Sequence, residues 1–235
     1  MELISLEPGK YGQIVEDRGF AVIPPVFEED RVVLLAENLA MANLRRSRAG
    51  VRHALGITAV ASLANDPRIL ELARCILGAS AYPFRATVFE KTTDANWLVV
   101  WHQDTALPLR RREETPGWGP WSVKEGVTYA HAPASALSQV LALRVHLDDS
   151  TSRNGPLRVL PATHMLGVLS DDTIHQLAQD IVPVECRVPR GGIVAMKPLL
   201  VHASSKSLSE CARRVLHIEY AANTAIAGNL ELAVV

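Results

Sequence analysis

The chain has 235 residues, of which 48% are hydrophobic and 21% are charged, with 24 Lys and Arg against 25 Asp and Glu. This is the composition of a globular protein and excludes a disordered chain. The near-neutral charge argues against nucleic acid or an anionic membrane as the main partner, because both attract a basic face. No apolar run approaches the ~20 residues of a membrane-spanning helix, and the first seven residues lack the basic and apolar regions of a secretory signal.

The three cysteines also limit the possible classes of protein. Cys75, Cys186 and Cys211 are widely spaced and form no Cys-x-x-Cys pair. This spacing excludes the common zinc and redox motifs and indicates a reducing, cytoplasmic location. The length predicts a single domain over residues 1–235, since sandwiches and barrels of this size often remain undivided.

The N-terminal third is predicted to be mostly helical. A short strand over 19–23 ends at the Pro24-Pro25 pair. A helix over 28–43 has apolar residues at helical spacing. A second helix over 66–77 begins at a capping Asn65 or Asp66 and ends at Gly78.

After Gly78 the pattern changes to short strands and turns, and only residues 171–179 have a clear helical pattern. The expected strands are 82–90, 97–102, 139–148, 156–160, 181–188, 193–196, 199–203 and 213–221. This order predicts a mainly β fold, an antiparallel sandwich or jelly roll with the N-terminal helices packed on it.

Residues 105–138 interrupt this pattern with several prolines and glycines. A structureless stretch of this length is uncommon in a compact domain unless it is a lid or a binding loop. A disordered surface insertion is the alternative. We favour an ordered lid, because the bulky side chains of Trp118 and Trp121 tend to be buried.

The sequence Trp101-His102-Gln103-Asp104 contains a candidate metal motif. On a strand, His102 and Asp104 would face the same way and could bind one metal ion, with His202 as a third ligand from a later strand. Two histidines and one carboxylate on one face of an octahedron are typical of non-haem Fe(II) oxygenases. The spacing alone does not select this pair, since His146/Asp148 and His217/Glu219 have it as well.

The surrounding residues select the first pair. A series of motifs follows in order along the chain: Gly19-Phe20-Ala21-Val22-Ile23, Lys91 followed by Trp101-His102-Gln103-Asp104, Leu147-Asp148-Asp149, Asn154-Gly155-Pro156-Leu157, His202-Ala203-Ser204, and Arg213 eleven residues after His202. With these motifs the chain resembles the phytanoyl-CoA dioxygenase-like family of Fe(II)- and 2-oxoglutarate-dependent oxygenases. Departures are Pro161-Ala162-Thr163-His164 in place of Pro-Gly-Ser-His, Gly191-Gly192 where Gly-Asp is common, and Ser207 where Asn often stands. They affect none of the proposed ligands.

The resemblance implies a double-stranded β-helix, or cupin-like jelly roll, and a set of roles. His102, Asp104 and His202 would bind Fe(II), while Arg213 and Ser204 would bind the 2-oxoglutarate carboxylate. The implied reaction uses O2, hydroxylates an unactivated C–H of a small organic substrate, and releases succinate and CO2. The carboxylate of Asp104 favours hydroxylation, because halogenating relatives lack it.

Alternation along two strands predicts which side chains face the interior. In strand 139–148, Arg144 and His146 share one face, while the other is apolar; in strand 213–220, Arg213, His217 and Glu219 share a face. If Arg213 points into the barrel, the polar faces line a cavity and the apolar faces lie under the helices. We predict substrate contacts from Lys91, Trp101, Arg144 and His146, with contact to 2-oxoglutarate as the alternative for Lys91 and core packing as the alternative for Trp101.

Two other classes of function remain open on the sequence. One is a cupin-type metal enzyme that uses the same ligands without 2-oxoglutarate, and the other is a non-catalytic jelly-roll binding protein. The requirement for Arg213 distinguishes the first of them. The sequence indicates neither the identity of the substrate nor the oligomeric state.

Overall fold

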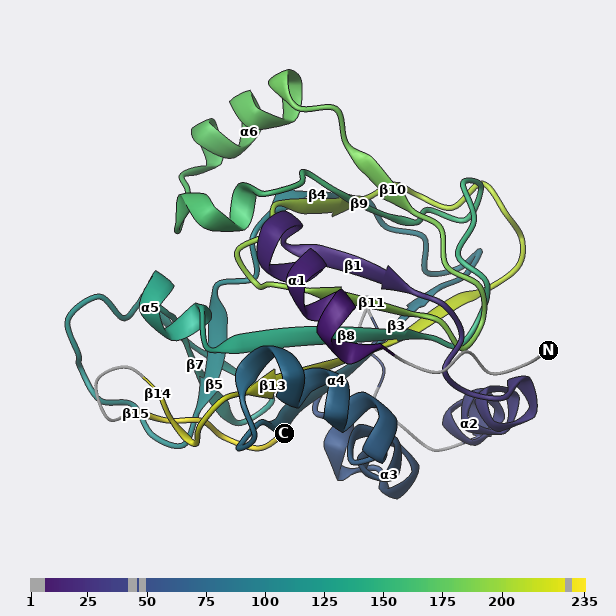
Figure 1. Cartoon of the computed structure of the whole chain (residues 1–235), viewed down its shortest axis with the longest axis horizontal. Coiled ribbons are helices and arrows are strands. Elements are labelled where there is room, and N and C mark those ends of the chain that lie inside the picture. Colours follow the sequence, from purple (N-terminus) through teal and green to yellow (C-terminus); the bar gives the residue numbers. More distant parts are fainter. Residues whose placement is uncertain (1–6, 42–45, 47–49, 227–229) are drawn as a thin grey trace.

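The computed structural model describes residues 7–41, 46, 50–226 and 230–235. Two antiparallel sheets face one another (Figure 1). The larger sheet has the order β1 (Phe20–Ile23), β11 (Ile193–Met196), β8 (Val140–His146), β13 (Arg213–Ala221), β3 (Tyr82–Lys91) and β2 (Gly50–Val51). The smaller sheet has the order β10 (Val184–Cys186), β9 (Leu157–Val159), β12 (His202–Ser204) and β4 (Val99–His102). This is the predicted jelly-roll core.

Helices cover the outer face of the larger sheet, as the strand alternation predicts (Figure 1). They are α1 (Pro8–Arg18), α2 (Glu29–Met41), α3 (Thr58–Ala64) and α4 (Pro67–Leu77). The apolar face of β8, with Leu141 and Leu143, packs in one cluster with Ile69 and Leu72 of α4. Burial of such aliphatic side chains contributes roughly 1.5–3 kcal/mol each, so the helices and the sheet stabilise one another.

The boundaries of the predicted helices agree with the structure where it describes them. Helix α4 begins after Asp66, whose carboxylate accepts a hydrogen bond from the backbone N–H of Arg68 at 3.0 Å. It ends at Gly78, which has a φ of 97°. Residues 42 and 43, the last two of the helix predicted over 28–43, lie outside the described residues. Residues 1–6, most of the segment in which the sequence shows no secretory signal, also lie outside them.

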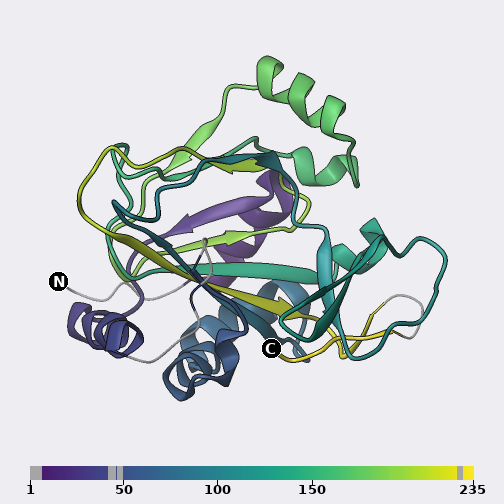
Figure 2. The same cartoon turned by 180° about the vertical axis from the view of Figure 1, so that it is seen from behind.

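Residues 105–138 are largely ordered, so the alternative of a structureless insertion was wrong. They form β5 (Ala106–Leu109), β6 (Trp121–Lys124), β7 (Val127–His131) and the short helix α5 (Ala134–Leu137), with the sheet order β5-β7-β6. The indole of Trp118 is buried in a separate apolar cluster. β14 (Ala225–Ile226) and β15 (Leu230–Glu231) lie against this sheet through the bridge between Leu109 and Leu232 (Figure 2).

The remaining elements are α6 (Asp171–Asp180), which matches the helix predicted over 171–179, and the 3-10 helices η1 (Ala54–Gly56) and η2 (Thr163–Leu166). The strand predicted over 199–203 begins later, at His202. Helix α1 was missed because only Gly12 and Val15 of its residues are buried, so its apolar stripe is weak. Within the described residues, no helix has the length and apolar character needed to cross a membrane.

Candidate metal and co-substrate site

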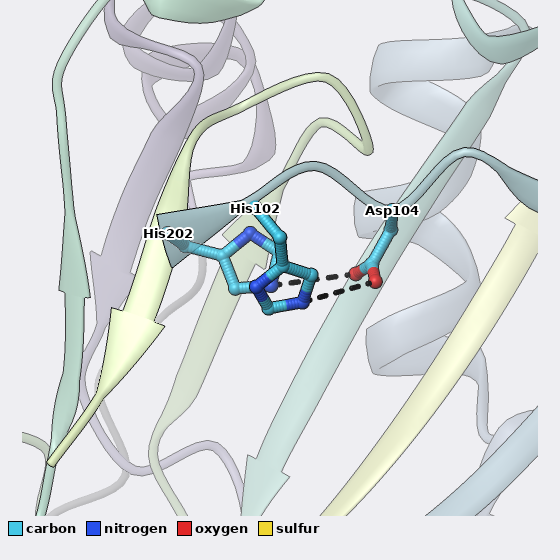
Figure 3. A group of neighbouring side chains, drawn as sticks. All are labelled: His102, Asp104 and His202. Carbon is cyan, nitrogen blue, oxygen red and sulfur yellow. Dashed lines mark ion pairs between the residues drawn. The ribbon is translucent and has the colours of Figure 1, made fainter. Parts of the chain in front are cut away.

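His102, Asp104 and His202 converge at the open edge of the smaller sheet (Figure 3). His102 ends β4 and lies opposite His202, the first residue of the neighbouring strand β12. The Nε2 atoms of His102 and His202 lie 3.7 and 3.6 Å from the carboxylate oxygens of Asp104. Asp104 follows the end of β4, where its backbone N–H donates to the carbonyl of Pro198 at 2.9 Å. A loop, rather than strand alternation, therefore places the carboxylate.

Backbone hydrogen bonds orient both imidazoles of this triad. The Nδ1 atom of His102 lies 2.8 Å from the carbonyl of Val100, and that of His202 lies 2.9 Å from the carbonyl of Leu200. Nδ1–H donation to a carbonyl leaves each Nε2 with a lone pair directed at Asp104. This is the orientation of histidines that bind a metal ion.

The protonation states also suit a metal ion. Burial lowers the pKa of His202 to about 4, against the opposing effect of Asp104. Burial opposes the ionisation of Asp104, but the nearby His202 and His102 outweigh it and hold the pKa of the carboxyl well below its usual range. A neutral imidazole and an ionised carboxylate are the ligand forms at neutral pH. Among the described residues, no other group of three His, Cys, Asp or Glu ligands lies as close together.

The two other His-x-acid pairs have different partners. Asp148 accepts hydrogen bonds from the guanidinium of Arg214 at 2.8 Å. Glu219 forms a bidentate ion pair with Arg85, and Nδ1 of His217 lies 3.0 Å from Nη1 of Arg144. Arginine thus already neutralises both carboxylates.

A cavity of about 100 Å³ adjoins the triad on one side. Three cations line it, Lys91, Arg144 and Arg213, and no described carboxylate lies within 4.0 Å of any of them. Buried cations without counter-ions are costly, because burial removes their hydration. The cavity is therefore built for an anion.

The cations are held by neutral groups. Nζ of Lys91 donates to Oγ of Ser204 at 2.7 Å and to the carbonyl of Ser205. Nε of Arg213 donates to the carbonyl of Asn154 at 3.1 Å, while its buried Nη1 has no hydrogen-bond partner among the described residues. Such a donor fits a carboxylate oxygen of a ligand.

Burial of Lys91 and Arg213 without a nearby carboxylate lowers the pKa values of both side chains. Burial and the neighbouring Arg213 and Arg144 lower the pKa of Lys91 to about 7. Burial and Arg144 lower the pKa of Arg213 to about 10. An anion in the cavity would relieve both effects.

Gly155 allows the chain to close around this cavity. Its φ is 68°, and a Cβ atom there would lie 2.3 Å from the carbonyl oxygen of Ser205 and 3.2 Å from Nζ of Lys91. Only glycine accepts both the left-handed backbone and this close approach. The Asn154-Gly155 motif therefore has a structural reason beside the anion-binding cavity.

A second cavity, of about 260 Å³, lies on the other side of the triad. It shares Phe89, His102 and Asp104 with the first cavity. Its other lining residues are Arg52, Arg85, Thr87, Lys124, Tyr129, His217 and Glu219. His102, Asp104 and Phe89 thus form a wall common to the anion-binding cavity and to a larger polar chamber.

The four residues predicted to contact substrate lie in three different environments. Lys91 and Arg144 line the first cavity, while His146 is fully buried and neither ring nitrogen has a hydrogen-bond partner among the described residues. Trp101 lies in a groove beside α6, 5.2 Å from the guanidinium of Arg158. The position of Trp101 does not support the predicted contact with substrate.

Several chamber residues were missed from the sequence. Arg85 lies on β3 opposite Glu219 of β13, and this pairing depends on a strand register that the sequence alone does not give. Lys124 and Tyr129 come from the 105–138 segment, which had no predicted strands. Arg52 follows β2, a strand of two residues that leaves no periodic signal.

The comparisons with solved structures support the fold. The crystal structure of AviO1 from Streptomyces viridochromogenes aligns with a TM-score of 0.68 and 21% identity, over 96% of this chain and 99% of that chain. The epimerase SnoN, in complex with Fe3+, alpha ketoglutarate and nogalamycin RO, aligns with a TM-score of 0.68 and 19% identity, over 93% of this chain and 84% of that chain.

A curated relative is the L-proline trans-4-hydroxylase of Streptomyces griseoviridis, which is 26% identical over 186 residues. The match covers 68% of this chain and 62% of the length of that relative. A model of the phytanoyl-CoA dioxygenase family matches residues 15–215. Since this match covers most of the chain and includes all three triad residues, the chain belongs to the phytanoyl-CoA dioxygenase family.

Proposed function

We propose that the protein is an Fe(II)- and 2-oxoglutarate-dependent dioxygenase that hydroxylates an unactivated C–H of a small organic substrate. Fe(II), 2-oxoglutarate and O2 are the cofactors of its family. The observation that carries the proposal is the His102–Asp104–His202 triad beside a cavity whose three cations have no described carboxylate within 4.0 Å. A metal site and an adjoining anion site together are what iron and a dicarboxylate require.

Each residue has a distinct role in this proposal. His102, Asp104 and His202 hold the iron, which supplies O2 activation coupled to decarboxylation of 2-oxoglutarate to succinate and CO2. Arg213 binds the distal carboxylate of 2-oxoglutarate through its free Nη1, and the adjacent Ser204 and Lys91, which are hydrogen-bonded to one another, complete the carboxylate site. The protein thereby fixes the orientation of the co-substrate on the metal.

The remaining features fit this function. A hydroxylase of a small amino acid is among the relatives, and the second cavity, of about 260 Å³, suits a small molecule better than nucleic acid or a membrane surface. Cys75, Cys186 and Cys211 are all free, which fits a reducing compartment such as the cytoplasm. We place the whole activity in one domain, with the 105–138 segment as its lid.

The test of this function needs no substrate. Fe(II) and then 2-oxoglutarate are added to the metal-free protein without oxygen, and the visible metal-to-ligand charge-transfer band of the chelate is recorded. We expect a band in the wild type, no band in His202→Ala, and a much higher 2-oxoglutarate requirement in Arg213→Ala. Lys206→Ala, an exposed residue in the neighbouring loop, is the matched control and should behave as the wild type.

The same titration separates the rival functions. Bound iron without a band would favour a cupin-type metal enzyme that does not use 2-oxoglutarate. No iron binding at all would favour a non-catalytic binding protein. An unchanged 2-oxoglutarate requirement in Arg213→Ala would contradict only the proposal that Arg213 binds 2-oxoglutarate and would leave the metal site unaffected.

A further inference from the structure

We propose that the second cavity accepts a small anionic substrate, whose anionic group, most simply a carboxylate, is held at the cavity mouth by Lys124 and Arg52. This inference rests on the proposed function, since it names the substrate class of the same site. It follows from the charges of the chamber, from its volume and from the position of its apolar wall.

The charges of the chamber are unevenly distributed, with the Asp104 carboxylate at the metal triad and the cations Arg52 and Lys124 at the mouth. Arg85 is fully engaged, because Nε and Nη2 bind the carboxylate of Glu219 and Nη1 donates to the carbonyl of Ala106 at 2.9 Å. Glu219 is in turn only 2% exposed and neutralised by that pair. This inner pair therefore leaves no net charge for a ligand.

The mouth of the second cavity carries an excess of positive charge. Glu125 lies 3.8 Å from Nη1 of Arg52 and 3.9 Å from Nδ1 of His53, and burial lowers the pKa of His53, so the carboxylate pairs with the charge of Arg52. Lys124 has no carboxylate within 4.0 Å in the described parts of the chain. Arg52 and Lys124 together thus exceed the single negative charge of Glu125 at the cavity mouth.

Lys124 is positioned rather than free in solution. It is the last residue of β6, and its Nζ lies 4.9 Å from the centre of the Tyr129 ring on the adjacent strand β7. The hydroxyl of Tyr129 lies 3.0 Å from Nε2 of His53, which connects this strand to the segment that carries Arg52. The face of the aromatic ring stabilises the ammonium group through a cation–π interaction and leaves its N–H donors available to a ligand.

The opposite end of the chamber suits a hydrocarbon. Thr87 and Phe89, neighbours on one face of β3, line the wall next to His102 and Asp104. The volume of about 260 Å³ lies below the 300–1,000 Å³ typical of pockets for drug-sized ligands. A small molecule with its anionic group between Lys124 and Arg52 would present its carbon chain to the metal.

The experiment compares acids with their amides. Pentanoate, cyclohexanecarboxylate and L-proline are each titrated beside pentanamide, cyclohexanecarboxamide and L-prolinamide. Binding is followed by calorimetry on the metal-free protein and by the shift of the anaerobic Fe(II)–2-oxoglutarate band. We expect at least one acid to bind, its amide to bind at least tenfold more weakly, and Lys124→Gln and Arg52→Gln each to weaken the acid by about tenfold, the effect of removing a charged hydrogen-bond partner at an accessible site.

Matched variants make the result specific. Lys10→Gln on α1 and Arg187→Gln after β10 remove exposed charges far from the chamber and should leave acid binding unchanged. Lys124→Arg should retain it. The inference is overturned when no acid binds, when amides bind as well as acids, or when Lys124→Gln binds acids as the wild type does.

The proposed function and this inference fail in different ways. Loss of the chelate band in the wild type contradicts the proposed function, while calorimetry on the metal-free protein still measures the preference for acids. An intact band in Lys124→Gln together with weakened acid binding supports both.

Discussion

Lys91 illustrates how burial and neighbouring charges prepare one side chain for a ligand. It is 1% exposed, lies directly opposite Arg213 in the β3–β13 ladder, and has only neutral hydrogen-bond acceptors. These conditions lower its pKa from 10.5 to about 7. A bound dianion would favour the charged form and raise that pKa again.

The affinity for 2-oxoglutarate should therefore depend on pH. Below the lowered pKa Lys91 is charged before the ligand arrives, whereas above it binding must first take up a proton. We expect the 2-oxoglutarate Kd to be nearly constant below about pH 6 and to rise with pH above about pH 7, with uptake of protons. Calorimetry in buffers of different ionisation enthalpy measures both quantities. Lys91→Arg, charged throughout this range, should give a flat profile; a sloping profile in Lys91→Arg would assign the dependence to another group.

At the scale of an element, Asp66 anchors the start of α4 against α2. Its carboxylate caps the helix, binds Arg68, and accepts from Nη1 of Arg31 on α2 at 2.6 Å. Burial opposes ionisation, but the hydrogen bonds from Arg68 and Arg31 dominate and lower the pKa from 3.8 to about 2. One carboxylate thus joins α2 to α4 over the sheet.

Asp66→Asn should destabilise the protein at neutral pH by about 1–2 kcal/mol, because the amide keeps the cap but loses the charged hydrogen bonds. The wild-type advantage is complete above the ordinary pKa of 3.8 and is lost as pH falls toward the lowered value of about 2. Urea unfolding across this range measures the difference in the free energy of unfolding. The control is Asp17→Asn on the exposed side of α1, for which a similar loss would contradict the assignment.

At the scale of the whole molecule, the proposed ligands connect the two sheets. The triad histidines belong to β4 and β12 of the smaller sheet, while Lys91 and Arg213 belong to β3 and β13 of the larger one. Iron and 2-oxoglutarate together would therefore cross-link the open end of the jelly roll. Ligands that bind only the folded state stabilise it in proportion to their concentration.

We expect Fe(II) to raise the Tm under anaerobic conditions, and 2-oxoglutarate to raise it further only when the metal is present. Saturation at about a hundred times Kd contributes roughly 2.7 kcal/mol, equivalent to several degrees for a chain of this size. Scanning calorimetry measures the shift. His202→Ala should lose both increments, and a full 2-oxoglutarate increment in that variant would show that the anion site works without the metal.

The sequence determined the layers of the fold because the side-chain patterns that encode them are local. Alternation in β8 and β13 and the apolar stripe of α4 placed the helices over the larger sheet, and the family motifs selected the metal triad among three His-x-acid pairs. The elements missed, such as α1, β2 and the β5-β7-β6 sheet, are short or have few buried residues, so their periodicity is weak.

Only the tertiary structure decided which groups meet. Asp104 reaches the two histidines through a loop held by Pro198, and the chamber combines Arg52, Arg85 and Lys124 from segments far apart in the chain. Such contacts depend on strand register and on the packing of loops against the sheets, which no local pattern records. The sequence thus predicted the type of chemistry, while the charge of the substrate chamber could be established only from the folded structure.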